Sequence, residues 1–177
     1  MEENSYFCTS YYIKGEVMRK ISNPFEGKQG YNCFGCSKDN PIGVHMDFYE
    51  DGDDIVSFWK PDGNYQGWVN VLHGGIQATL MDEIAGWVVF KKLQLMGVTS
   101  KLEVKYKQPV LTTELQLTLR GRILKQVRNL VTIGVTLENS HGEICTEATA
   151  LYYLFDEKKS KENGFVGCHL EGDEFLL

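Results

Sequence analysis

The amino-acid sequence predicts an α+β protein in which an antiparallel sheet wraps around one long buried helix. Segments in which apolar and polar side chains alternate with a period of two stand on both sides of a single long segment with helical periodicity. Two strands precede this helix and four follow it. Because the helix is apolar on most of its sides, a flat sheet would leave part of it uncovered, and we expect the sheet to curve around it.

The two strands before the helix are predicted to form a hairpin. Apolar and polar side chains alternate over residues 44–49, an acidic turn follows at 50–54, and a second strand covers 55–59. Residues 31–41 are rich in Cys, Gly, Asn and Pro and are predicted to be a loop, as are residues 61–72.

The long helix is predicted over residues 74–92, with Gly97 as its stop signal. Its apolar side chains form two adjacent stripes, which is typical of a buried helix. The stripes are Ile76, Leu80, Ile84 and Trp87, and Ala78, Met81, Ala85 and Val88.

Four strands are predicted after the helix from their alternating patterns. They cover residues 102–109, 115–123, 131–137 and 144–155, with a turn at 139–142. Consecutive strands joined by short turns are typical of an antiparallel sheet.

The domain itself is placed at residues 31–156. Residues 1–30 are predicted to be an N-terminal extension. Residues 157–177 are polar and rich in Lys, Glu and Gly, and they are predicted to be a loose C-terminal tail.

A short helix is predicted inside the N-terminal extension. Ile13, Val17 and Ile21 recur at a spacing of four residues, Ser10 is a candidate cap, and Asn23-Pro24 would end the helix.

Composition limits the class of protein. The 177 residues, 42% of them hydrophobic, suffice for one domain with a real core. The net charge of -6 argues against a nucleic-acid-binding surface, which needs clustered Lys and Arg. The polar N-terminus shows no secretory signal, and the longest apolar stretch is too short to span a bilayer. We therefore expect a cytoplasmic protein with no membrane or nucleic-acid partner.

The cysteines do not indicate a disulfide framework, because their number, five, is odd. Cys33-Phe34-Gly35-Cys36 forms a C-x-x-C motif. A zinc site needs about four ligands, and the sequence shows no second C-x-x-C and no paired His. We expect a tight turn with two partly buried thiols, no metal and no separate cofactor; a metal or redox function is the alternative.

His73-Gly74-Gly75 stands where a loop becomes the long helix. The first amides of a helix lack internal partners and lie at the positive end of its dipole, and glycines allow close approach of another molecule. The motif therefore indicates either an acceptor site for a polarised carbonyl or a histidine that simply caps the helix.

Asp82 and Glu83 lie in the middle of the buried helix. Burying a carboxylate there lowers the stability of the fold unless the group has a polar partner, so such a carboxylate indicates either a partner or a functional role. Asp82 has small neighbours one turn away, which would leave a hollow above its carboxylate. Glu83 lies beside Leu80 and Trp87, a more crowded place. Asp82 is the stronger functional candidate, and a structural hydrogen-bond network is the alternative for both.

Helix geometry separates His73 from Asp82. Nine residues at about 100° each place them on opposite sides of the helix, roughly 13 Å apart along it. If both act on one substrate atom, the site must be composite, with the helix start of one chain facing Asp82 of its partner in a two-fold dimer.

The motifs together resemble one family. Residues 66–83 read QGWVNVLHGGIQATLMDE, residues 33–36 read CFGC, residues 40–44 read NPIGV, and Thr99 to Pro109 completes the pattern. Over roughly residues 31–155, the chain resembles the PaaI-like branch of the hotdog-fold thioesterases.

The resemblance implies a hotdog fold, a dimer with a continuous sheet and active sites at the dimer interface. It implies that Asp82 is the catalytic carboxylate and that the amide of Gly74 polarises the thioester carbonyl. His73 matches the histidine of the glycine motif, and Thr99 a hydroxyl that positions water or the carboxylate.

One position departs from some relatives, which carry an Asn six residues before the histidine where this chain has Gly67. Asn70 is a nearby amide that does not match that position. Asn70, Gly75 and Glu83 are the candidate substrate contacts.

The expected activity is hydrolysis of an acyl-CoA thioester to the free acid and CoA, by a homodimer or a homotetramer. The CoA is part of the substrate, so no cofactor is expected. The alternatives are a hotdog hydratase or dehydratase and a non-catalytic acyl-CoA-binding module.

Overall fold

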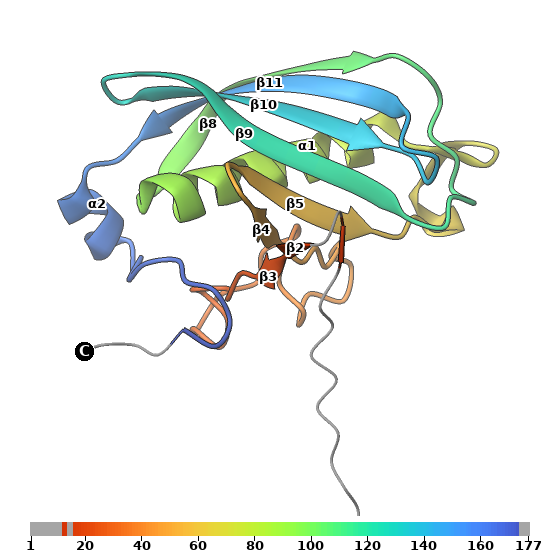
Figure 1. Ribbon diagram of the computed structural model, residues 1–177. Coiled ribbons are helices and arrows are strands. Elements are labelled where there is room, and N and C mark those ends of the chain that lie inside the picture. The colour runs from red at the N-terminus through yellow and green to blue at the C-terminus, as the bar shows by residue number, and fades with distance from the viewer. Residues whose placement is uncertain (1–11, 14–15, 174–177) are drawn as a thin grey trace, which may run out of the picture.

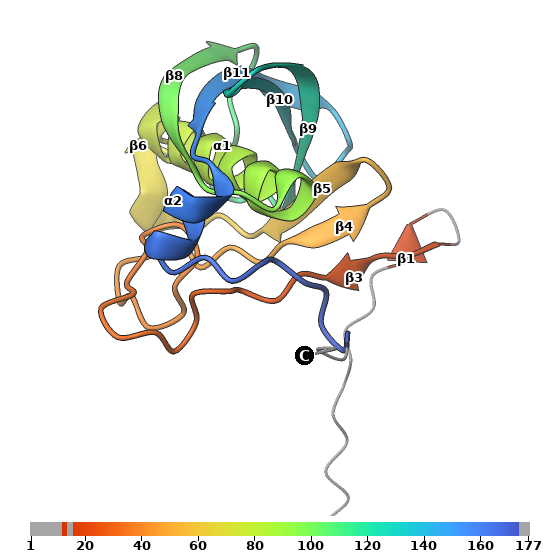
Figure 2. The same ribbon diagram turned by 90° about the vertical axis from the view of Figure 1, so that its left-hand side faces the viewer.

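The computed structural model describes residues 12–13 and 16–173 and contains a seven-stranded antiparallel sheet curled around the long helix α1 (Gly74–Val88). Figure 1 shows the long strands lying over α1, and Figure 2, viewed from the side, shows the sheet bending around it. The predicted α+β architecture is confirmed. In spatial order the strands are β3 (Arg19–Lys20), β4 (Tyr49–Asp51), β5 (Asp54–Trp59), β9 (Leu117–Val127), β10 (Leu130–Glu138), β11 (Ile144–Leu154) and β8 (Gly97–Tyr106).

The core forms where α1 meets the concave face of this sheet. Leu80, Met81 and Ile84 of α1 are completely buried, and the ring of Trp87 stacks on Phe48 with centroids 4.3 Å apart. Along β9, β10 and β11 alternate side chains are buried, as their period of two predicts. Asp82 and Glu83 are only partly buried, so one side of α1 is left without cover from the sheet.

The helical segment ends close to the predicted residue 92, but Gly97 does not stop it. After Val88 the chain continues as the π-helix η2 (Val89–Leu93), and Gln94 then adopts a left-handed conformation, with φ 53°. Gly97 is therefore not the stop signal but the first residue of β8. A β-carbon there would lie 2.8 Å from the carbonyl oxygen of Tyr153, so glycine permits the close strand pairing. No described helix is long and apolar enough to span a membrane.

The first hairpin is confirmed, but its first strand is shorter than predicted. Residues 44–48 alternate in burial and yet do not belong to the sheet ladder. The amides of Val44 and Met46 instead donate to the carbonyls of Phe34 and Gly35. This pairing anchors the C-x-x-C loop to the edge of the core.

The segment 61–72 is more regular than the predicted loop. It contains a short 3₁₀ helix, η1 (Gly63–Tyr65), and a small hairpin of β6 (Gln66–Trp68) and β7 (Val71–Leu72). The hairpin delivers the chain directly to the start of α1.

The short helix predicted in the N-terminal extension is wrong where the structure describes it. The chain forms β1 (Tyr12–Ile13), β2 (Glu16–Val17) and β3, and β3 pairs with β4. A spacing of four is also a multiple of two, so the same pattern suits one face of a strand. The proposed cap, Ser10, lies outside the described residues.

The C-terminal segment is not loose over residues 157–173. It forms helix α2 (Glu157–Glu162) and then packs back, burying Ser160, Phe165 and Cys168. The side chain of Gln94 holds it by hydrogen bonds with the backbone of Cys168. The limits of the domain and its two extensions remain a prediction.

Strand β8 is a long edge of the sheet. Within the described residues it pairs only with β11, and most of its side chains are exposed. An unpaired ten-residue edge is a surface on which another strand can pair.

A buried hydrogen bond between the sheet and α1 is expected to support the start of the helix. Thr146 donates to the Oε1 atom of Gln77 at 2.6 Å, and the Nε2 group of Gln77 donates to the carbonyl of Leu72. Both side chains are buried, so Thr146→Val should leave Oε1 unpaired and lower the free energy of unfolding by about 1–3 kcal/mol. Denaturant unfolding measures the loss. Thr132→Val, at a half-buried threonine of β10, is the control, and an equal effect of the two variants would contradict the assignment.

Candidate active site

His73 begins α1 as its N-cap. Its Nδ1 atom accepts a hydrogen bond from the amide of Gly75 at 2.8 Å. The proton of the neutral ring therefore lies on Nε2. His73 therefore caps the helix, and this cap occupies the Gly75 amide.

The amide of Gly74 is placed differently. None of the described residues forms a hydrogen bond with it, while the carbonyl of Gly74 accepts a bond from the hydroxyl of Tyr106 at 2.8 Å. A β-carbon at position 74 would lie 3.2 Å from that hydroxyl. The helix start thus presents an available amide at the positive end of the dipole, beside the exposed strand β8.

Asp82 is held at the other end of the same strand. The hydroxyl of Thr99 donates to Oδ1 of Asp82 at 2.8 Å. The hydroxyl of Tyr152 donates to the carbonyl oxygen of Asp82 at 2.9 Å and lies 3.3 Å from Oδ1. Burial and the nearby Asp82 carboxylate raise the pKa of Tyr152, so its phenol remains a proton donor. The carboxylate therefore has a fixed orientation.

A cavity of about 440 Å³ opens in front of Asp82. The hollow predicted above this carboxylate is present, and Gly86 contributes to it. A side chain at Gly86 would meet the hydroxyl of Tyr152 at 3.3 Å. Aromatic side chains from the N-terminal extension, from the loop that follows it and from α1 and η2 also line the cavity; these are Phe25, Tyr31, Trp87 and Phe90.

The two halves of the predicted site lie in separate hollows of one chain. His73 and Gly75 line a second cavity, of about 370 Å³, with Tyr65 and Thr79. No residue is shared between this cavity and the one that contains Asp82. This separation agrees with the helix arithmetic that placed the two motifs on opposite sides of α1.

Glu83 is engaged by the C-x-x-C loop. Both of its carboxylate oxygens lie 3.6 Å from the sulfur of Cys33, and Oε1 accepts a hydrogen bond from the indole of Trp87 at 3.1 Å. A hydrogen bond from Cys36 lowers the pKa of Cys33 to about 7. The same contact, together with burial and Glu83, raises the pKa of Cys36.

Gly67 and Asn70 occupy the hairpin before the helix. A β-carbon at Gly67 would lie 2.8 Å from Cδ2 of His73, so the ring that caps the helix fills the space of any side chain there. Asn70 is exposed and has a φ of 61°, a conformation that suits Asn in a tight turn. The structure gives Asn70 a turn role, and its substrate contact remains a prediction.

Sequence reasoning missed Tyr106 and Tyr152 as partners of the two motifs. Both stand in strands that alternate, where a tyrosine is an ordinary core or surface residue. Only the register of β8 against β11 and the position of α1 bring their hydroxyls to Gly74 and Asp82.

Comparison with known proteins agrees with this fold. Residues 69–146, which include both motifs, match the model of the thioesterase superfamily. The fold is thus the hotdog fold, and residues 69–146 are similar to the thioesterase superfamily. An uncharacterised protein of Schizosaccharomyces pombe is 28% identical over 105 residues, which cover 57% of this chain and 60% of the relative.

Solved structures share the fold. A hypothetical thioesterase of Streptococcus pneumoniae, solved with coenzyme A, is 26% identical, with a TM-score of 0.58 over 62% of this chain and 85% of that one. A Streptococcus mutans protein bound to acetyl CoA is 20% identical, with a TM-score of 0.57 over 62% of this chain and 88% of that one. The second likeness shows the fold alone.

The contact between Gly67 and His73 predicts an energetic coupling. His73→Ala should lower the free energy of unfolding by about 0.5–2 kcal/mol through loss of the cap. Gly67→Ala should also destabilise the protein, because its methyl group meets the imidazole. In the His73→Ala background, Gly67→Ala should lower the free energy of unfolding by at least about 0.5 kcal/mol less than it does in the wild-type protein. A double-mutant cycle by denaturant unfolding measures this, and strictly additive costs would argue against the contact.

Proposed function

We propose that this protein hydrolyses an acyl-CoA thioester to the free acid and CoA. The observation that carries the proposal is the Asp82 carboxylate, fixed by Thr99 in the wall of an apolar cavity, in a domain similar to the thioesterase superfamily. The available amide of Gly74 supplies the second element that such a reaction needs, a hydrogen-bond donor for developing negative charge on the carbonyl oxygen.

In this proposal each active site is built from two chains, and the chains associate through the edge strand β8. Thr99 near one end of β8 contacts Asp82, and Tyr106 at the other end contacts Gly74. If two β8 strands pair antiparallel about their midpoints, the Thr99 end of one meets the Tyr106 end of the other. This arrangement brings Asp82 of one protomer toward Gly74 of its partner and extends the sheet across a two-fold homodimer.

In the mechanism, the thioester carbonyl accepts a hydrogen bond from the amide of Gly74 on the partner subunit. The dipole of α1 stabilises the negative charge that develops on this oxygen. Asp82 removes a proton from a water molecule that attacks the carbonyl carbon, or attacks that carbon itself. The carbon–sulfur bond then breaks and CoA leaves as a thiolate, a good leaving group that takes up a proton.

The acyl group occupies the cavity in front of Asp82. Its apolar wall suits an acyl chain or an aromatic acyl group, and an acyl group bound there would have its carbonyl carbon near the Asp82 carboxylate. The coenzyme A found with the Streptococcus pneumoniae thioesterase supports CoA as the carrier. We further propose that the protein belongs to the PaaI-like branch, is cytoplasmic and forms a homodimer.

Loss of the carboxylate should abolish most of the activity. Asp82→Asn keeps the size of the side chain and its contact with Thr99 but removes the base, so acyl-CoA hydrolysis should fall by about 10²–10⁴-fold. A thiol-release assay over acyl-CoAs of varied length and aromaticity measures turnover, and sedimentation checks that the dimer is kept. Near-normal turnover of the variant would refute the role of Asp82. Tight acyl-CoA binding by the wild-type protein without turnover would instead indicate a binding module, and hydration of a crotonyl thioester a hydratase.

The amide of Gly74 can be removed with little disturbance of the helix. Proline is tolerated at the first helical position, and the preceding residue, His73, already has the extended conformation that proline requires. Gly74→Pro should lower turnover by about 10²–10³-fold through loss of the donor. Gly74→Ala carries a β-carbon at the same place but keeps the amide, and it should retain much more activity than Gly74→Pro. Equal losses in both variants would show that crowding against Tyr106, not the amide, is responsible.

Mixed dimers test the composite site. A dimer of one Asp82→Asn chain and one Gly74→Pro chain contains one intact site if each site draws on both chains, and none if each lies within one chain. Co-expression of the two inactive variants with different tags should restore about half of the wild-type turnover in the purified heterodimer. A heterodimer as inactive as its parents would contradict the shared site.

A further inference from the structure

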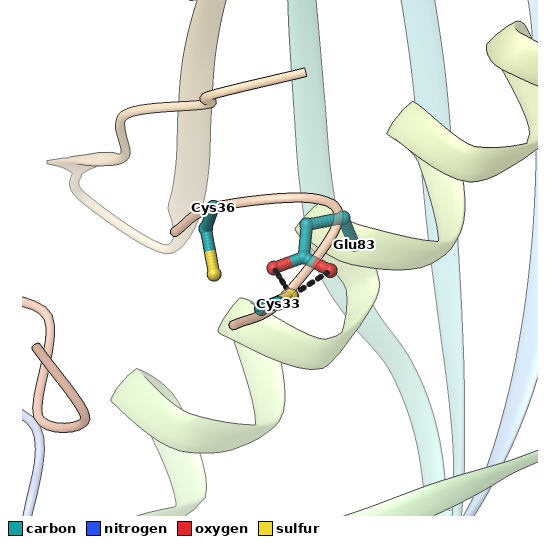
Figure 3. Close-up of side chains that lie close together, drawn as sticks. All are labelled: Cys33, Cys36 and Glu83. Carbon is teal, nitrogen blue, oxygen red and sulfur yellow. Dashed lines mark hydrogen bonds between the residues drawn. The ribbon is translucent and has the colours of Figure 1, made fainter. Parts of the chain in front are cut away.

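The C-x-x-C loop and Glu83 form a three-residue cluster at the wall of the cavity. The sulfurs of Cys33 and Cys36 and a carboxylate oxygen of Glu83 all lie within 4.8 Å of one another. Figure 3 shows both oxygens of Glu83 pointing at Cys33, with Cys36 beside them in the same loop. Fifty residues separate Cys33 from Glu83 in the sequence, so the sequence motif shows only two of the three groups.

The cluster holds three acidic groups and no positive charge. No lysine or arginine of the described residues forms an ion pair with Glu83, which accepts hydrogen bonds from the thiol of Cys33 and the indole of Trp87. A partly buried carboxylate aimed at two thiols is an arrangement that a divalent cation stabilises strongly, because it offsets the charge of each deprotonated ligand.

The distance between the Cys33 sulfur and the Glu83 oxygens suits a tetrahedral zinc ion. With a zinc–sulfur distance of about 2.3 Å and a zinc–oxygen distance of about 2.1 Å, a tetrahedral angle places sulfur and oxygen about 3.6 Å apart. The oxygens of Glu83 lie 3.6 Å from the sulfur of Cys33. Two sulfur ligands and one carboxylate favour zinc over magnesium or calcium, which prefer oxygen ligands throughout.

Each of the three groups also has an outer partner that orients it. The amide of Gly35 donates to the sulfur of Cys33 at 3.3 Å, the hydroxyl of Tyr31 lies 2.8 Å from the sulfur of Cys36, and Trp87 donates to Glu83. Gly35 is required for this arrangement, because a β-carbon there would overlap Glu83 at 2.3 Å. Outer hydrogen bonds of this kind fix the ligands of metal sites.

We propose that Cys33, Cys36 and Glu83 bind one zinc-class divalent cation, with the fourth coordination position open to the cavity. All three residues line the cavity in which Asp82 also stands. Three protein ligands and one open position are the pattern of zinc sites that accept water or a ligand. The metal also fastens the C-x-x-C loop to α1. This inference does not rest on the thioesterase proposal, because metal binding is measured without turnover.

The test uses the untagged full-length protein, reduced with a phosphine, stripped with a chelator and reloaded. Elemental analysis after loading should find about one zinc per chain. Cobalt(II) titration should give a thiolate-to-cobalt charge-transfer band and tetrahedral visible bands. The thermal midpoint should rise with zinc concentration and fall on chelation, because the metal binds the folded state. Reduced protein that takes up no zinc and gives no charge-transfer band would overturn the proposal.

Matched variants locate the site. Glu83→Gln, Cys33→Ser and Cys36→Ser should each weaken cobalt binding by about 10–100-fold or more, since loss of an outer partner alone costs that much. Asp82→Asn changes the neighbouring carboxylate of the same helix and cavity, and Cys168→Ala removes a buried thiol elsewhere; both should bind metal like the wild type. Circular dichroism checks folding of every variant.

The outcomes separate the two proposals. Loss of hydrolysis with unchanged metal binding in Asp82→Asn supports both assignments. Cobalt binding that survives with full affinity in folded Glu83→Gln and in the double variant Cys33→Ser, Cys36→Ser would overturn the metal site, whatever the outcome for hydrolysis.

Discussion

Burial of α1 inside the curved sheet is the constraint on which the rest of the structure depends. The helix is apolar on most of its sides, and the sheet covers these sides with β5, β8, β9, β10 and β11. The side that the sheet leaves partly open carries Asp82 and Glu83. Placing carboxylates there avoids the cost of burying charge in the core and turns the uncovered side of the helix into the wall of a cavity.

Strand β8 links the two chemical elements of the site. It runs along α1 so that Thr99 reaches Asp82 and Tyr106 reaches the helix start. Its outer edge has no partner in the described chain. One strand therefore orients the carboxylate, supports the helix terminus and offers the edge through which two chains can combine their halves of the site.

Local sequence patterns predicted much of the fold and failed where tertiary pairing decided the backbone. The alternation of apolar and polar residues was sufficient to predict the strands β9, β10 and β11, because each of them has one buried face. The predicted N-terminal helix was wrong because Ile21 lies where the chain pairs with β4 and the C-terminal segment. The predicted stop at Gly97 was wrong because a left-handed Gln94, held by contacts with the backbone of Cys168, ends the helix earlier.

The sequence by itself determined the helix start at His73-Gly74-Gly75, the carboxylate at Asp82 and their placement on opposite sides of one helix, since helical geometry depends only on residue spacing. Tertiary structure decided which groups surround them. Tyr106 and Tyr152 reach the site through strand register, and Glu83 reaches Cys33 through the packing of a loop on α1. Such contacts join residues far apart in the chain, and no local period records them.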